Sequence, residues 1–159
     1  MSLPTPPPPQ LLPIEAQWCL DANRSQRSSR SGPCIELEVA RTPQQQSWGL
    51  MGRPPLAPLR GMWFPYDQPQ VLKFWMHRTP APLDMLFIRD QRVIAIEAGA
   101  TPCPRLPCRS YGPDEPADGV VELAAGEASR LGIQLGSPAL IQPFKPLPAT
   151  ARPAAPARD

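Results

Sequence analysis

A chain of 159 residues suits a single domain, and its formal net charge of +2, from 16 basic and 14 acidic side chains, provides no strong field for nucleic acid or an anionic membrane. Proline accounts for 26 residues, about three times its average share, which argues against an all-helical fold because proline lacks the amide hydrogen that a helix interior needs. No apolar run approaches the roughly 20 residues that cross a bilayer, so we expect neither a nucleic-acid partner nor an integral membrane segment.

The two ends of the chain are rich in proline and poor in large apolar side chains. We therefore predict disordered tails over residues 1–11 and 143–159, around a single domain over residues 12–142. The opening residues lack the basic start and apolar stretch of a secretory signal. A cytoplasmic location is the default expectation, and export is the alternative.

In the first half of the domain, alternating apolar and polar residues predict half-buried strands over residues 14–20 and 34–39. The Ser-, Arg- and Gly-rich residues 21–33 between them are expected to form an irregular, solvated loop. A capping hydroxyl at Thr42, a proline at position 43 and a glutamine at position 45 predict a short helix that ends near Gly52. A short strand is expected over residues 62–64.

Three strands are predicted next, over residues 71–78, 83–89 and 92–98, and their short connections favour an antiparallel meander. The register that buries the apolar side chains on one face pairs Phe74 with Phe87 and Met76 with Met85, and then Phe87 with Ile94 and Met85 with Ile96. On the other face this register places His77 opposite Asp84 and Asp84 opposite Glu97, with Trp75 beside them.

The last part of the domain begins with a long irregular segment over residues 99–116. A strand is predicted over residues 120–124, one or two helical turns over residues 126–131, and a final strand over residues 138–141. Seven or eight short strands and two short helices predict a mainly β fold, either an antiparallel β-sandwich or a partly open barrel.

Several short stretches follow one another with a recognisable order and spacing. They are Gly49-Leu50-Met51 with Arg53, Gly61-Met62 with Phe64, Phe74-Trp75-Met76 with Thr79, Pro82-Leu83-Asp84 with Phe87-Ile88, and Pro102-Cys103. Over about residues 34–142 this pattern resembles the family named domain of unknown function 192. The resemblance implies a compact β-rich domain, often found in exported bacterial and archaeal proteins, without an assigned activity. His77 and Arg78 depart from the family pattern, in which a lysine and an asparagine usually follow the Phe-Trp-Met run.

The four cysteines form two local pairs, Cys19 with Cys34 on facing strands and Cys103 with Cys108 in a proline-bounded loop. Each pair could be bridged, and we expect disulfides or inert thiols, because the spacing is neither a typical zinc motif nor a redox motif. Disulfides would fit an oxidising compartment better than the cytoplasm.

The sequence contains no phosphate-binding glycine loop, nucleophile elbow or paired CxxC motif, so we expect no cofactor and favour a protein that is not an enzyme. The leading hypothesis is a ligand-binding or interaction module. Its candidate ligand-binding residues are Trp75, His77, Asp84, Glu97 and Arg53.

Two alternatives stay open. One is a metal-assisted or acid/base enzyme that uses His77, Asp84 and Glu97, and the other is a structural accessory domain whose tails recruit partners. For Arg53, an ion pair with a carboxylate of the protein is expected in preference to an anionic ligand. The remaining candidates are read as core fillers in preference to a soft ligand pocket; they are Met51, Met62, Met76, Met85, Trp48, Trp63 and Trp75.

Overall fold

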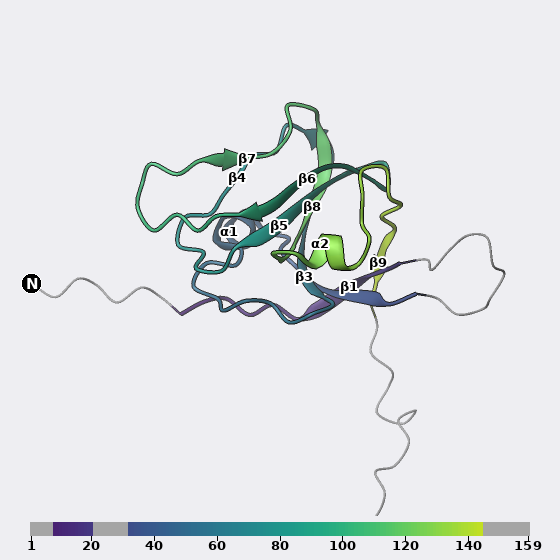
Figure 1. Ribbon diagram of the computed structural model, residues 1–159, viewed down its shortest axis with the longest axis horizontal. Helices are drawn as coiled ribbons and strands as arrows, with labels where there is room; N and C mark the ends of the chain where they lie inside the picture. The colour runs from purple at the N-terminus through teal and green to yellow at the C-terminus, as the bar shows by residue number, and fades with distance from the viewer. Residues whose placement is uncertain (1–7, 21–31, 145–159) are drawn as a thin grey trace, which may run out of the picture.

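The computed structural model describes residues 8–20 and 32–144, and it is mainly β as predicted (Figure 1). Most of the predicted tails and of the 21–33 loop lie outside the described residues. The strands are β1 (Ile14–Cys19), β2 (Cys34–Val39), β3 (Arg60–Gln70), β4 (Phe74–Trp75), β5 (Leu83–Arg89), β6 (Arg92–Ala100), β7 (Ser110–Tyr111), β8 (Ala117–Ala124) and β9 (Ile141–Pro143). The two short helices are α1 (Pro43–Trp48) and α2 (Glu127–Arg130), and neither is long or apolar enough to cross a membrane.

Seven strands form one mixed sheet in the order β6-β5-β8-β3-β2-β1-β9, and β4 and β7 form a second, small sheet. Only the β2–β3 pair in the large sheet is parallel. The segment before β9 also reaches the far edge strand, because Val93 N–H donates to Ser137 O at 3.0 Å and Ala139 N–H donates to Gln91 O at 2.7 Å. The sheet therefore curls toward closure as a partly open barrel.

The two faces of the large sheet bury separate apolar cores. Because strand side chains alternate between faces, Leu86 and Ile88 enter the first core while Met85 and Phe87 enter the second. Trp18 and residues from α2 complete the first core. The second core includes Phe74 and Tyr111 of the small sheet, which therefore packs on that face.

The predicted register between residues 83–89 and 92–98 is correct at the turn and wrong beyond it. The tight turn pairs Arg89 with Arg92 and Ile88 with Val93 as expected, but a β-bulge then pairs Phe87 with Ala95 in place of Ile94. From there the register is shifted by one residue, so Met85 lies opposite Glu97.

The first strand of the predicted meander also has a different partner. Phe74 and Trp75 pair with β7, and the second neighbour of β5 is β8. Phe74 and Phe87 still meet, with ring centroids 6.2 Å apart, but as side chains from different sheets. Within residues 71–78 only Phe74 and Trp75 form a strand, and their backbone partners are residues 110–111, far along the chain.

Helix α1 has the predicted start. The Gln45 N–H donates to Thr42 Oγ1 and the Thr42 N–H donates to Gln45 Oε1, both at 3.1 Å, which completes a capping box. The helix ends at Trp48, earlier than the expected Gly52, because the next residue, Gly49, adopts φ +50° and stops the helical repeat.

The structure corrects the inner boundaries of the predicted tails. The Gln10 side-chain amide donates to Gln45 O and Gly49 O, both at 2.9 Å, and so satisfies carbonyls at the end of α1. At the other end, Phe144 N–H donates to Glu15 O at 2.9 Å. Gln10, Pro143 and Phe144 therefore contact the domain, although the segments that contain them were predicted to be disordered.

Candidate functional site

A pocket of about 480 Å³ lies over the second core, between α1, β3, β8 and the small sheet. Aromatic side chains form much of its wall, and they are Trp48, Phe64, Tyr66, Phe74 and Trp75. The polar side chains that line it are Gln46, Ser47, Lys73, Thr79, Ser110 and Glu122. A volume of this size is typical of small-molecule sites, and the mixture of aromatic and polar side chains suits a ligand that carries both apolar and polar groups.

Glu122 belongs to a row of side chains that crosses five neighbouring strands on the second-core face. Register partners in the row are Glu38 of β2, Met62 of β3, Glu122 of β8, Met85 of β5 and Glu97 of β6. Three carboxyl groups thus alternate with two methionines. The environments of the three carboxyl groups differ, and this difference defines the site.

The first carboxylate of the row is paired. Glu38 Oε1 lies 2.6 Å from Arg53 Nη1 and accepts a hydrogen bond from Leu12 N–H at 2.9 Å. The side chains of Arg53 and Glu38 are 12% and 10% exposed, so this ion pair is largely buried. Arg53 therefore neutralises a carboxylate of the protein, and it is not among the pocket residues.

The Glu122 carboxyl is the unpaired member. Its residue is 4% exposed, and within residues 8–20 and 32–144 it makes no hydrogen bond or ion pair. Burial raises the pKa of Glu122 from 4.5 to about 8, so this carboxyl is protonated at neutral pH. Burial, and then the nearby Glu122 charge, raise the pKa of Tyr66.

A second polar group of the pocket wall is also unsatisfied. The indole Nε1–H of Trp48 is buried without an acceptor among the described residues. Lys73, in contrast, is already engaged, because its Nζ donates to Gly112 O at 2.6 Å and to Asp114 Oδ1 at 3.0 Å. The pocket therefore combines an unpaired carboxyl and an unpaired donor with an engaged cation.

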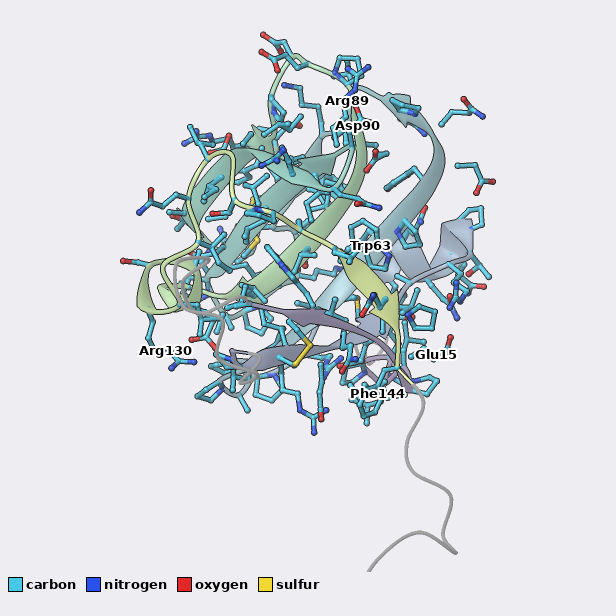
Figure 2. The ribbon with its side chains drawn as sticks, turned by 90° about the vertical axis from the view of Figure 1, so that its right-hand side faces the viewer. Glu15, Trp63, Arg89, Asp90, Arg130 and Phe144 are labelled. Atoms are coloured by element: carbon cyan, nitrogen blue, oxygen red, sulfur yellow. A yellow bond between two sulfur atoms is a disulfide. The ribbon has the colours of Figure 1, made fainter. Side chains whose placement is uncertain are left out.

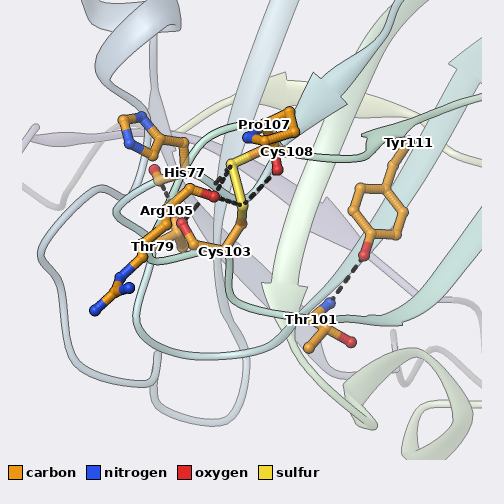
Figure 3. Close-up of a disulfide and its surroundings, with 8 residues drawn as sticks. All are labelled: His77, Thr79, Thr101, Cys103, Arg105, Pro107, Cys108 and Tyr111. Carbon is orange, nitrogen blue, oxygen red and sulfur yellow. Dashed lines mark hydrogen bonds between the residues drawn. A yellow bond between two sulfur atoms is a disulfide. The ribbon is translucent and has the colours of Figure 1, made fainter.

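Of the ligand-binding residues predicted from the sequence, only Trp75 lines this pocket. It is 46% exposed, and its ring lies against that of His77 with centroids 5.0 Å apart. His77 itself forms a β-bridge with Cys103, beside the second disulfide (Figure 3). The prediction that His77 lies opposite Asp84 is wrong.

Asp84 points to the opposite face of the sheet from Glu122, toward α2. One carboxylate oxygen accepts from Gly99 N–H at 2.9 Å, and the other accepts from Gly126 N–H and Ala128 N–H, both at 3.0 Å. Asp84 is 1% exposed and saturated by the backbone, so its contacts are structural.

The predicted trio of His77, Asp84 and Glu97 is therefore not assembled. Glu97 lies opposite Met85, and the prediction that it lies opposite Asp84 is wrong because of the bulge described above. In the described part of the chain no three metal-ligating side chains gather, so these residues form no metal centre there.

Both cysteine pairs are bonded. Cys19 and Cys34 are register partners in β1 and β2, with Cα atoms 3.9 Å apart, and Cys103 and Cys108 have Cα atoms 5.9 Å apart (Figure 3). The second disulfide holds the 99–116 segment next to the strand bridge at His77.

The sequence analysis missed Glu122 and Tyr66 as site residues, and it interpreted Trp48 as a core filler in preference to a pocket residue. A signal for Glu122 exists, because it is the one charged residue in the apolar run Val120-Val121-Glu122-Leu123. The sequence analysis grouped Trp48, Trp63 and Trp75, but only Trp48 and Trp75 line the pocket. Trp63 lies near β9 (Figure 2) and packs against the first core, on the opposite face of the sheet from the pocket.

Comparisons with known proteins identify a family but no activity. No curated protein matches the chain. A crystal structure of a protein named provisionally as a transcription regulator, from Sinorhizobium meliloti 1021, is 32% identical with a TM-score of 0.65, and the match covers 81% of this chain and 92% of that one.

A second crystal structure, of a protein of unknown function from Novosphingobium aromaticivorans DSM 12444, is 30% identical with a TM-score of 0.65, and the match covers 80% of this chain and 83% of that one. The profile of one family, described as uncharacterized ACR, matches residues 25–140. The chain therefore belongs to the family named domain of unknown function 192.

Proposed function

We propose that this domain is a small-molecule binding module whose site is the pocket over Glu122. One observation carries the proposal: a nearly buried carboxyl lines the pocket and makes no hydrogen bond within the described chain. Burial of a polar group costs free energy unless a hydrogen bond compensates it, so a polar ligand group that reaches this carboxyl would be bound favourably. A bound ligand would supply that hydrogen bond.

The wall of the pocket favours binding over catalysis. Its hydroxyl groups belong to Ser47, Thr79, Ser110 and Tyr66. Among the described residues, the Thr79 hydroxyl donates to the His77 backbone oxygen at 3.4 Å. None of the four hydroxyls is hydrogen-bonded to a side-chain base in that part of the chain. An activated nucleophile needs such a base, so the arrangement supports a binding role.

A thermal-shift screen of small polar molecules tests this proposal, with one matched pair of variants on α1. Ser47→Trp places a large ring at an exposed position of the pocket wall, whereas Gln44→Trp places the same ring on the same helix outside the pocket. Molecules that stabilise the wild-type chain should fail with Ser47→Trp and succeed with Gln44→Trp. Hits that survive Ser47→Trp, or the absence of any hit, would contradict the proposal.

The compartment is a separate proposal. Two disulfides favour an oxidising compartment, because reducing systems keep cytoplasmic thiols free. We expect all four cysteines to resist alkylation when cells that naturally produce the protein are quenched with a thiol reagent before lysis. Four alkylated cysteines would instead support a cytoplasmic protein.

A further inference from the structure

We infer that the ligand of this pocket carries a protonated amine, which binds to the Glu122 carboxylate between the aromatic walls. The inference rests on the proposed function and specifies the chemical class of the ligand.

The first argument comes from the hydrogen-bonding capacity of the groups in the pocket. An ionised carboxylate only accepts hydrogen bonds, and both Glu122 oxygens lack a donor among the described residues. An ammonium group is its complement, with three donors and a positive charge, and charge-assisted bonds of this kind are about twice as strong as neutral ones.

The second argument comes from the wall. The faces of aromatic rings attract cations, and five aromatic side chains border the pocket. Phe64 and Phe74 already form one corner, with ring centroids 5.1 Å apart in an edge-to-face arrangement. An ammonium group would thus contact rings on its sides and the carboxylate at its base.

The third argument comes from the charges that face Glu122. Its flanking strands present Met62 and Met85, and α1 contributes no charged side chain. The titratable groups on this face are Tyr66 of β3, Lys73 before β4, Tyr111 of β7, Glu97 of β6 and the Arg53–Glu38 ion pair.

None of these groups neutralises Glu122. The Lys73 and Arg53 cations are held by Asp114 and Glu38, respectively, at 3.0 Å and 2.6 Å. These two cations are therefore already paired, and the charge partner of Glu122 would come from the ligand.

This chemistry predicts a specific pH dependence. Burial raises the pKa of Glu122 to about 8, so an ammonium ligand must displace a proton below that pH. Its affinity should therefore weaken about tenfold for each pH unit below 8, and level off above it. A neutral or anionic ligand that accepts the carboxyl proton in a hydrogen bond would show the opposite trend.

The experiment compares three probes of matched size, n-butylammonium, n-butanol and butyrate, by calorimetry at pH 6, 7 and 9 with the full chain. n-Butylammonium stays charged at pH 9 because alkylamines ionise near 10.4, as lysine does. Glu122→Gln keeps the shape of the neutral side chain without its charge. Glu115→Gln, an exposed carboxyl outside the pocket, is the control.

We expect the wild-type chain and Glu115→Gln to bind n-butylammonium best at pH 9 and about tenfold more weakly at pH 7. Glu122→Gln should lose both the preference for the cation and its pH dependence. Equal or tighter binding of n-butanol or butyrate, or no binding of n-butylammonium at pH 9 while a screening hit still binds, would overturn the inference and leave the pocket proposal standing. If no compound of any class binds, both fail.

Discussion

At the scale of single residues, the row of three carboxyl groups shows how position alone assigns different roles to one residue type. Glu38 has an arginine and a backbone amide as partners, and Glu97 lies partly exposed near the sheet edge. Glu122, at the centre of the row, is surrounded by methionines and by the pocket. The strand order therefore determines which carboxyl is free to bind a ligand.

The raised pKa of Glu122 predicts how the free energy of unfolding of the domain, measured without added ligand, depends on pH. The folded state holds this proton up to about pH 8 and the unfolded state releases it near 4.5. Between these values the unfolded chain binds fewer protons, so the free energy of unfolding should fall as the pH rises, by about 1.4 kcal/mol per pH unit. Urea titrations of wild type and Glu122→Gln at pH 5, 6, 7 and 8 measure this slope.

We expect Glu122→Gln to lack this descending slope and to be more stable than wild type at pH 8. Glu115→Gln should retain the wild-type slope. Identical slopes for wild type and Glu122→Gln would show that the carboxyl is better solvated than its position indicates.

The buried Arg53–Glu38 pair predicts a large asymmetry between single and double substitutions. Arg53→Met leaves the Glu38 carboxylate buried without its cation, which should lower the free energy of unfolding by about 3 to 5 kcal/mol. The double variant Arg53→Met with Glu38→Gln should recover much of that loss. The matched control is Arg41→Met, which breaks the exposed Arg41–Glu15 pair and should cost less than about 1 kcal/mol. Urea denaturation provides the comparison, and equal losses for the two single variants would contradict the assignment.

At the scale of elements, local sequence patterns correctly predicted the features that depend only on residues close together in the chain. The alternation at β1 and β2, the capping box of Thr42 and the tight turn at residues 90–91 all depend on neighbours within a few positions, and all are present. The bulge at Ile94 could not be predicted in this way. The alternation of apolar and polar residues continues on both sides of it, and no residue type in the sequence marks the extra residue.

Local sequence patterns also could not predict which strands pair when the strands are far apart in the chain. The partners of β5 and of β4 lie in β8 and β7, between 31 and 41 residues further along the chain, and a hydrophobic pattern does not indicate which strand will be its partner. Glu122 of β8 likewise comes near Tyr66 of β3 only through the long-range pairing of β8 with β3, so the pocket could not be assembled from the sequence. Individual members such as Trp75 could be identified, but their neighbours could not.

Asp84 links three elements, and its substitution should loosen all three. Asp84→Ala leaves the N–H groups of Gly99, Gly126 and Ala128 without their acceptor, so we expect a loss of about 3 kcal/mol. Amide exchange at residues 126 and 128 should accelerate, because these donors begin α2. Asp118→Ala is the control, since that carboxylate accepts a single bond from Asp90 N–H at an exposed turn and its removal should cost about 1 kcal/mol. Unchanged exchange at α2 in Asp84→Ala would contradict this structural role.

At the scale of the whole molecule, the pocket depends on how the small sheet and α1 are held against the large sheet. The Cys103–Cys108 disulfide fixes the segment that carries Ser110 of the pocket wall, whereas the Cys19–Cys34 disulfide ties β1 to β2 at the other end of the fold. The two crosslinks therefore affect different properties, one the shape of the site and the other the stability of the sheet.

This separation predicts different effects for the removal of each disulfide. Loop-closure entropy favours the longer loop, so Cys19→Ala with Cys34→Ala, which opens a separation of 15 residues, should cost about 3 kcal/mol of unfolding free energy. Cys103→Ala with Cys108→Ala opens a separation of 5 residues and should cost about 2 kcal/mol.

Ligand binding should show the reverse order, because only the second pair anchors a segment that lines the pocket, the one that carries Ser110. At a temperature where both variants are folded, Cys19→Ala with Cys34→Ala should bind a screening hit as the wild type does, and Cys103→Ala with Cys108→Ala should bind it more weakly, since Ser110 and the β4–β7 pairing lose their anchor. Urea denaturation and calorimetry on the same samples measure both properties. A larger loss of affinity in the Cys19 and Cys34 variant would place the binding site elsewhere, near the pocket that Cys19 and Leu140 line.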